Sequence, residues 1–274
     1  MKSDYKAPGL LKVHSRKEFA MGFKGLAWTT IQSWLSVTTQ ISLMIVLSRL
    51  ISPSDFGMYA LAFAPVALVS TMAELGIGAA IVRSHSEVYL IAGNGICLAA
   101  ITSILGISSV VVLSIVLQEN GEVSQGAASL MLWLAPTVLL STFSSCGLGV
   151  LQRAQRFKSM AIVEILAQVI NALVTITCAI VGYKSWALLC GTLAFQTTKM
   201  VSVLMLALPK PRFKVESMKE ILVFSSGFVW LKLINTASST IDRLLVAEFF
   251  KKMILHTRKR LVQFQLYEQL TPAN

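Results

Sequence analysis

Seven runs of predominantly apolar residues, each long enough to cross a bilayer, dominate this sequence. About 20 apolar residues coiled as an α-helix span the hydrocarbon core of a membrane. The runs cover residues 25–48, 58–82, 89–117, 126–150, 161–182, 185–208 and 221–247. Only 14% of the residues are charged, whereas a soluble domain carries about 25%. The sequence therefore predicts an all-α fold, a polytopic membrane helix bundle with about six or seven transmembrane helices.

Lys and Arg residues are distributed unequally between the two sets of predicted loops. One set has fourteen: Lys2, Lys6, Lys12, Arg16, Lys17, Lys24, Arg83, Arg153, Arg156, Lys158, Lys210, Arg212, Lys214 and Lys219. The opposite set has only Arg49 and Lys184. Because basic residues gather in cytoplasmic loops, the N-terminus and the even-numbered loops are predicted to be cytoplasmic. The same rule accounts for the net charge of +11 without a nucleic-acid partner.

A short internal repeat suggests how the spans are organised. GLAWTTIQSWLSVTTQ (25–40) and GFVWLKLINTASSTID (227–242) align without a gap. Six spans lie between the two starts, so both copies enter the membrane in the same direction, as in transporters built from two parallel halves. The predicted organisation is a cytoplasmic basic arm (1–24), a six-helix transmembrane bundle (25–208), a cytoplasmic loop (209–220), a seventh helix that opens a second half (221–250) and a basic tail (251–274).

Polar residues recur at helical spacing inside several spans, so that they share one face of each helix. The candidates for a polar substrate cavity are Gln32, Gln40, Glu74, Gln168, Asn171, Lys199, Lys232, Asn235, Asp242 and Arg243. A charge near the bilayer centre costs about 2.5–3.5 kcal/mol on insertion scales, so charged members need partners or water. Two interpretations follow: a wet, charged cavity between helices, or internal pairing such as Glu164 with Lys199.

Three cations lie where the fourth span meets the cytoplasm. Arg153, Arg156 and Lys158 could contact lipid or substrate phosphate there, or could simply determine the topology. Short motifs for a nucleophile, a metal or a nucleotide are absent from the sequence. The sequence therefore predicts no enzyme, no catalytic residue, no metal and no cofactor.

Five stretches, in order, resemble the polysaccharide transport family. They are LSRLISPSDFGMYALA (47–62), AELGIGAAIVR (73–83), LGVLQRAQRFK (148–158), GYKSWALLCG (182–191) and IDRLLVAEFF (241–250). This family contains the O-antigen and colanic-acid-type lipid-linked oligosaccharide flippases of the multidrug/oligosaccharidyl-lipid/polysaccharide exporter superfamily. Within the first stretch, Ser52-Pro53-Ser54-Asp55 is expected to form a turn in which Ser or Asp caps the second helix.

The resemblance implies two six-helix bundles arranged in a V around a central cleft in the bacterial inner membrane. The implied substrate is an undecaprenyl-diphosphate-linked oligosaccharide, flipped by alternating access. Membrane lipids and a partner polymerase or export machinery are implied as well. Phosphate would be neutralised by cations at Arg49, Arg83, Lys199, Lys232 or Arg243.

The chain departs from the family pattern at its C-terminal end. The resemblance implies about twelve spans arranged in two halves. This sequence has only the first bundle and one further helix. A truncated product with a foreign tail is expected, and a half-size transporter that dimerises is the alternative, so the oligomeric state stays open. The alternative functions are a drug or cation exporter of the same superfamily and an inert membrane fragment.

Overall fold

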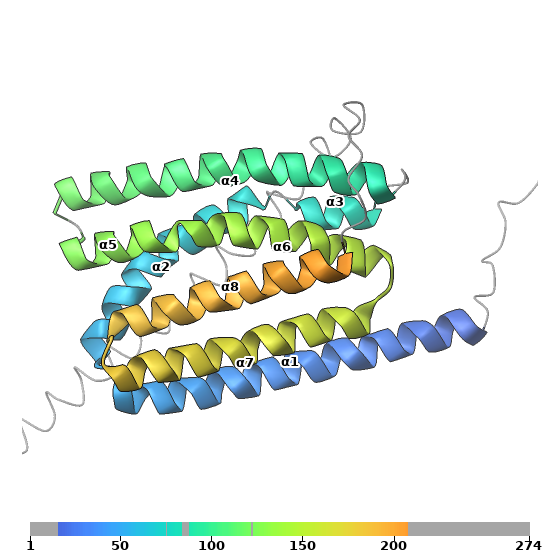
Figure 1. Ribbon diagram of the computed structural model, residues 1–274, viewed down its shortest axis with the longest axis horizontal. Helices are drawn as coiled ribbons and strands as arrows, with labels where there is room; N and C mark the ends of the chain where they lie inside the picture. Colours follow the sequence, from blue (N-terminus) through green and yellow to red (C-terminus); the bar gives the residue numbers. More distant parts are fainter. Residues whose placement is uncertain (1–15, 75, 84–87, 122, 208–274) are drawn as a thin grey trace, which may run out of the picture. The chain divides into compact units, whose positions relative to one another are not determined.

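The computed structural model describes residues 16–207 except 75, 84–87 and 122, and this part of the chain is helical without strands. Its helices are α1 (Arg16–Leu50), α2 (Pro53–Ala73), α3 (Ile77–Arg83), α4 (Val88–Glu119), α5 (Gln125–Leu134), α6 (Pro136–Arg153), α7 (Phe157–Val181) and α8 (Ser185–Ala207) (Figure 1). The predicted seventh helix and the basic tail lie outside the described residues.

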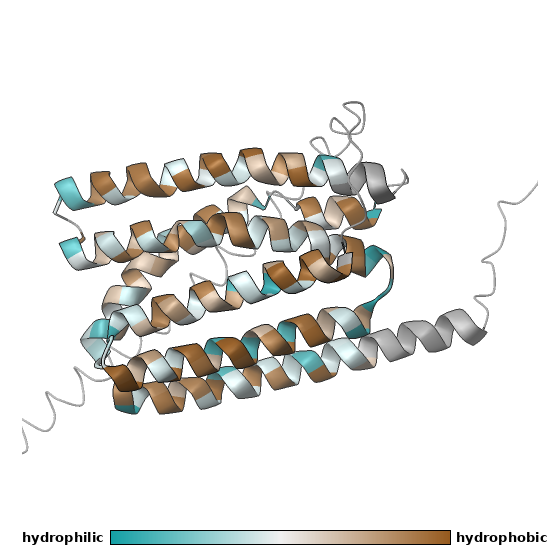
Figure 2. Cartoon of the chain, viewed as in Figure 1, coloured by the Kyte–Doolittle hydropathy of each residue, from teal (hydrophilic) through white to brown (hydrophobic). Residues whose placement is uncertain are grey.

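Six candidate membrane spans are present in the described part of the chain. They are Ala27–Leu50, Pro53–Arg83, Gly93–Glu119, Gln125–Arg153, Phe157–Val181 and Ser185–Leu206. Hydrophobic residues run along much of the length of these helices (Figure 2). The predicted fold class, an all-α membrane helix bundle, is confirmed. The second span starts earlier than predicted because Ser52 caps α2, and its hydroxyl accepts a hydrogen bond from the Asp55 backbone N–H at 3.2 Å.

The second span is interrupted in its last third, which the predicted continuous run 58–82 did not indicate. The helix α2 ends at Ala73, and the Ile77 N–H donates to the Glu74 carbonyl at 2.8 Å in a tight turn. Gly76 has a φ of +65°, a left-handed conformation that glycine adopts without steric cost. Hydropathy alone does not detect this break, because Leu75, Gly76 and Ile77 are all compatible with an apolar run.

The fourth span is also interrupted, at Pro136, between α5 and α6. Proline has no N–H to donate and its ring crowds the preceding turn, so the helix kinks. The Thr137 hydroxyl donates to the Leu134 carbonyl at 2.6 Å, and the Val138 N–H turns back to Ala135 at 3.1 Å. These contacts satisfy carbonyls that would otherwise be unpaired in lipid.

Small residues allow the helices to approach closely. A Cβ on Gly149 of α6 would lie 2.7 Å from the Cα of Gly78 on α3, and a Cβ on Gly106 of α4 would lie 2.8 Å from Val138. The described residues form three apolar clusters: one contains Ile77 and Leu151, a second contains Val66 and Leu134, and a third contains Leu47. Without a hydrophobic force between helices in lipid, such close packing supplies much of the association energy.

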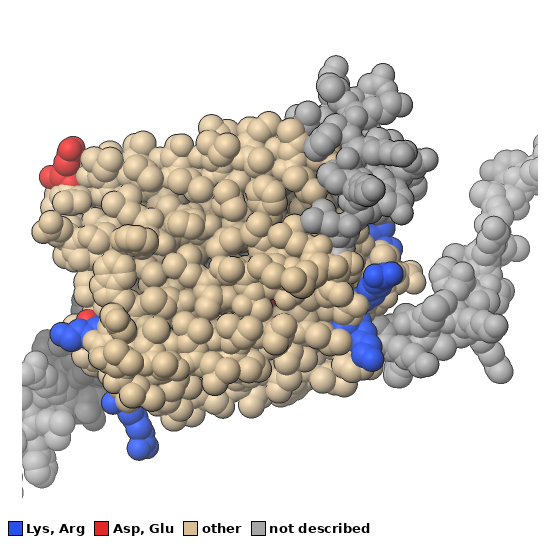
Figure 3. Space-filling view, in the orientation of Figure 1, with Lys and Arg blue, Asp and Glu red and all other residues tan. Residues whose placement is uncertain are grey.

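The outer surface of the bundle is suited to lipid. Trp34, Met44 and Met205 are 70%, 67% and 83% exposed. Charged side chains lie at the two ends of the face shown in Figure 3, and uncharged side chains cover its middle. An apolar surface of bilayer height between charged ends is typical of a membrane-spanning bundle.

Candidate functional site

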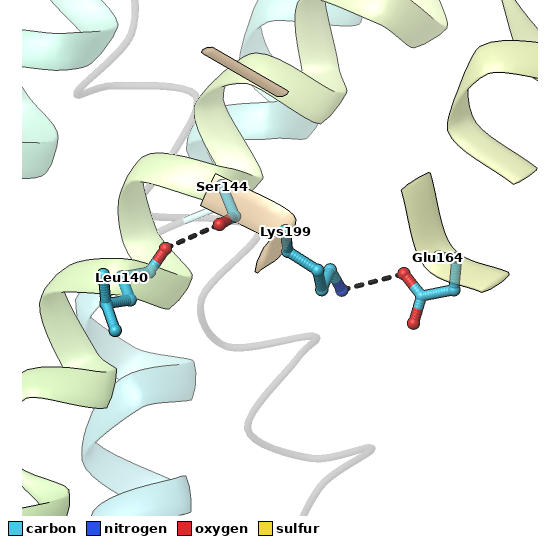
Figure 4. A network of polar contacts seen from close by, with 4 residues as sticks. All are labelled: Leu140, Ser144, Glu164 and Lys199. Atoms are coloured by element: carbon cyan, nitrogen blue, oxygen red, sulfur yellow. Dashed lines mark hydrogen bonds and ion pairs between the residues drawn. The ribbon is translucent and has the colours of Figure 1, made fainter. Parts of the chain in front are cut away.

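An ion pair between α7 and α8 is the central feature of the candidate site. The Lys199 Nζ lies 2.9 Å from the Glu164 Oε2, and the two side chains are only 16% and 20% exposed. Figure 4 shows the Lys199 ammonium group pointing toward the Glu164 carboxylate. The same ammonium lies 4.9 Å from the centroid of the Phe195 ring, within the range of a cation–π contact. For these two residues the structure shows the internal pairing that the sequence left as an alternative.

Both charges lie within candidate membrane spans, several residues from the nearer helix end. Glu164 follows the first residue of α7, Phe157, by seven positions, which is about 10 Å along a helix. Lys199 precedes the last residue of α8, Ala207, by eight positions, which is about 12 Å. Two opposite charges paired within a membrane span lower the cost of inserting one another.

The turn between α7 and α8 aligns the two charges. Gly182 and Lys184 adopt left-handed conformations with φ of +93° and +50°, and they reverse the chain within a few residues. Further along, a Cβ on Gly191 of α8 would overlap the Thr175 hydroxyl and lie 2.6 Å from the Asn171 Oδ1. This close antiparallel packing places residue 199 opposite residue 164.

Two predicted cavity residues of α7 continue the polar face beyond Glu164. Gln168 is one turn further and only 6% exposed. Asn171 is half-buried, and its Oδ1 accepts a hydrogen bond from the Thr175 hydroxyl at 3.1 Å. Gln168, Asn171 and Lys199 are therefore brought to one side of the bundle, where α7 contacts α8 and α1.

The polar stripe of α1 faces α7. The two helices lie side by side in Figure 1 and run in the same direction. Lys158 at the start of α7 lies 5.8 Å from the ring centroid of Trp28, and Leu47 packs in one apolar cluster with Ala179. On α1, Gln32 is half-buried, whereas Gln40 is exposed at the flank of this contact.

Other predicted cavity residues lie elsewhere. Arg49 is exposed at the last turn of α1, and Arg83 is exposed at the last turn of α3. Glu74 is half-buried in the turn between α2 and α3. Lys232, Asn235, Asp242 and Arg243 lie outside the described residues, so their place in a cavity stays a prediction.

The three predicted cytoplasmic cations have different surroundings. Arg153 is half-buried, and its guanidinium donates to the Ile81 carbonyl at 3.2 Å, in the last turn of α3. Arg156 and Lys158 are exposed, and Lys158 lies over Trp28. Arg153 therefore has a clear structural role, whereas Arg156 and Lys158 remain accessible to phosphate.

Two hydrogen bonds that the sequence did not indicate tie α8 to α2. The Tyr59 and Thr192 hydroxyls are 2.6 Å apart, and the Ser185 hydroxyl donates to the Asp55 Oδ1 at 3.1 Å. Sequence reasoning also left Ser36 off the candidate set, although it lies four residues after Gln32 on the same stripe. Its hydroxyl oxygen is buried and has no hydrogen-bond partner among the described residues.

Comparison with known protein families gives a match over most of the chain. The family model described as polysaccharide biosynthesis protein matches residues 46–263 of the 274. The match begins in the last part of α1 and includes α2 to α8. Searches of curated proteins and of solved structures found no significant match. The match confirms the resemblance inferred from the five sequence stretches: this multi-pass membrane chain belongs to the polysaccharide biosynthesis protein family.

Proposed function

We propose that the chain exports a polysaccharide precursor by flipping a lipid-linked oligosaccharide across the bacterial inner membrane. The observation that carries this proposal is the Glu164–Lys199 pair, which lies within a six-span apolar bundle of a polysaccharide biosynthesis protein. Such an intramembrane charge marks a substrate pathway more often than a packing contact. The chain acts as a carrier and not as an enzyme, with an undecaprenyl-diphosphate-linked oligosaccharide as its substrate.

Lys199 is the residue that recognises the diphosphate. Glu164 neutralises the Lys199 ammonium group across 2.9 Å, which lowers the cost of holding this group in the bundle. A substrate phosphate offers the same chemistry with more acceptor oxygens, so it can replace the carboxylate as the partner of Lys199. Exchange of one anion for another keeps the ammonium paired throughout the transport cycle.

Arg156 and Lys158 provide a first contact for the head group at the cytoplasmic end. Both are exposed beside the α6–α7 turn, where a lipid phosphate would lie. The excess of Lys and Arg on this set of loops favours a cytoplasmic N-terminus. The lipid-linked oligosaccharide would reach the protein from the surrounding bilayer. After transport it would be passed to a polymerase or other export machinery.

A transport assay with matched variants of the ion pair tests this function. Proteoliposomes containing the full chain would receive radiolabelled undecaprenyl-diphosphate-linked sugar, and its transfer between leaflets would be measured. Lys199→Arg should retain most transfer, whereas Lys199→Met should lose at least about tenfold, because an unpaired, partly buried carboxylate remains and no cation meets the phosphate. Lys184→Met, in the exposed α7–α8 turn, is the control.

The double variant Lys199→Met/Glu164→Gln separates a transport defect from misfolding. It leaves no unpaired charge, so the bundle should insert normally while transfer stays low. Wild-type transfer no faster than in protein-free vesicles would reject the flippase proposal.

A drug or cation exporter is the second candidate, favoured by the Glu164 carboxylate within the bundle. A cationic substrate would pair with Glu164 in place of Lys199. In that case the wild type would extrude cationic dyes, Glu164→Gln would abolish the extrusion, and the labelled sugar lipid would not be transferred.

A further inference from the structure

Two cysteine thiols contact each other across α7 and α8. Cys178 lies near the end of α7 and Cys190 near the start of α8, and one thiol donates a hydrogen bond to the other. Twelve positions separate the two residues, and the tight turn between the helices brings them together. All four cysteines of the chain lie in the part that the structure describes, and all are free thiols.

The two helices approach closely at the level of these thiols. A Cβ on Gly191, the residue after Cys190, would overlap the Thr175 hydroxyl. Thr175 precedes Cys178 by three residues, so the two share one face of α7. A disulfide needs Cβ atoms about 3.5–4.5 Å apart, which only closely packed helices permit. The contact between α7 and α8 therefore provides the approach that such a bond requires.

The thiol pair lies near the turn between the helices and is not sealed in the core. Cys178 precedes Val181, the last residue of α7, by three positions, and Cys190 follows Ser185, the first residue of α8, by five. These separations are about 5 Å and 8 Å along a helix. Both cysteines are half-buried, whereas Cys146 is only 2% exposed. The pair is therefore more accessible to a small reagent than the core thiol.

We propose that Cys178 and Cys190 are a redox site, at which an intramolecular disulfide joins α7 to α8. Two S–H bonds break and one S–S bond forms between the two sulfur atoms. The two protons and two electrons pass to a disulfide-bearing oxidant, which is reduced to two thiols by thiol–disulfide exchange. This redox site does not depend on the identity of the transported substrate.

The predicted topology suits this modification. The unequal distribution of Lys and Arg favours a position of the α7–α8 turn outside the cytoplasm. Disulfides form and persist in oxidising compartments, such as the bacterial periplasm, and are rare in the cytoplasm. The redox site is therefore near the side of the membrane on which a disulfide is retained.

A disulfide at the redox site would fix the register of α7 against α8. The same helix–helix contact holds the Lys199 Nζ 2.9 Å from the Glu164 Oε2. A cross-link also restricts the unfolded chain, so the oxidised protein should be more stable than the reduced one.

Thiol counting with matched variants tests the redox site. Purified full-length protein in detergent would be reduced, freed of reductant and equilibrated with mixtures of oxidised and reduced glutathione. Free thiols would be counted after denaturation with a polymer-linked maleimide, and mass spectrometry would identify the disulfide-linked peptides. The variants are Cys178→Ala and Cys190→Ala. Cys97→Ala is the matched control, because Cys97 is also half-buried but lies on α4.

Oxidation should lower the number of free thiols in the wild type from four to two, with one peptide pair linking Cys178 to Cys190. Cys97→Ala should form the same link. Neither Cys178→Ala nor Cys190→Ala should form an intramolecular link. The oxidised wild type should melt at a higher temperature than the reduced wild type, whereas oxidation should leave the melting temperature of Cys190→Ala unchanged.

Four free thiols in the wild type under the most oxidising mixture would overturn the redox site. A link that includes Cys97 or Cys146 would do the same, as would a link between two copies of the chain. If the linked protein melted at a lower temperature than the reduced protein, the native spacing of the helices would not fit the bond. The two thiols would then be small apolar packing groups only.

Discussion

Gly149 of α6 and Gly78 of α3 pack backbone against backbone: a Cβ added to Gly149 would lie 2.7 Å from both the Cα and the carbonyl oxygen of Gly78. Neither partner can yield easily, because the atoms that would be struck belong to the main chain. The short helix α3 can therefore approach α6 this closely only because both contact positions are glycine.

Replacement of Gly149 by alanine should destabilise the bundle by about 1–3 kcal/mol, the usual cost of overpacking a filled contact. Thermal unfolding in detergent, followed by circular dichroism, would measure the effect. Gly57→Ala is the matched control, since a Cβ there meets nothing within 4 Å and alanine is the better helix former. Equal melting temperatures for the two variants would contradict this account of the α3–α6 contact.

Breaking the ion pair on one side should cost more stability than removing both charges. Lys199→Met leaves Glu164 unpaired at 20% exposure, and such a residual charge costs about 3 kcal/mol or more. The double variant Lys199→Met/Glu164→Gln should recover most of that loss. A double-mutant cycle on melting temperature checks this, and additive losses would show that the two groups act independently.

Tyr59→Phe should weaken the α2–α8 contact modestly. It removes the hydroxyl that lies 2.6 Å from Thr192, and interhelical hydrogen bonds in membranes average about 0.6 kcal/mol. Tyr183→Phe is the control, because that side chain is 57% exposed. Denaturant titration in mixed micelles would measure the free energy of unfolding of both variants. A larger loss of unfolding free energy for Tyr183→Phe than for Tyr59→Phe would contradict this prediction.

The orientation in the membrane can be checked with single cysteines in a chain whose four native cysteines are replaced. A membrane-impermeant maleimide added to whole cells should label Lys184→Cys, in the turn between α7 and α8. It should label Arg156→Cys only after the membrane is opened. Labelling of Arg156→Cys in whole cells, without labelling of Lys184→Cys, would contradict the topology predicted from the Lys and Arg distribution.

Much of the fold followed from hydropathy, because in lipid each span must satisfy its own backbone as a helix. Most ends of the six described spans therefore lie within a few residues of the ends of the predicted apolar runs. The breaks at Gly76 and Pro136 were not predicted, since apolar residues continue on both sides and hydropathy does not report φ.

The candidate site was predictable only in part. Glu164 and Lys199 lie on consecutive spans joined by a short turn, so their pairing could be proposed as an alternative before the structure was known. The bond between Tyr59 and Thr192 could not, because 133 positions separate them and hydroxyl residues are common in every span. The burial of Ser36 depends on which face of α1 meets α7, which the polar stripe suggests but does not determine.

The dependence of α3 on Arg153 has a consequence for biogenesis. The Ile81 carbonyl, in the last turn of α3, receives a hydrogen bond from Arg153 at the end of the fourth span, 72 positions later in the sequence. This hydrogen bond between the second and fourth spans can therefore form only after the ribosome has delivered the fourth span. Nascent chains released after residue 124 should be degraded by membrane proteases faster than chains released after residue 156, which would already contain the missing guanidinium.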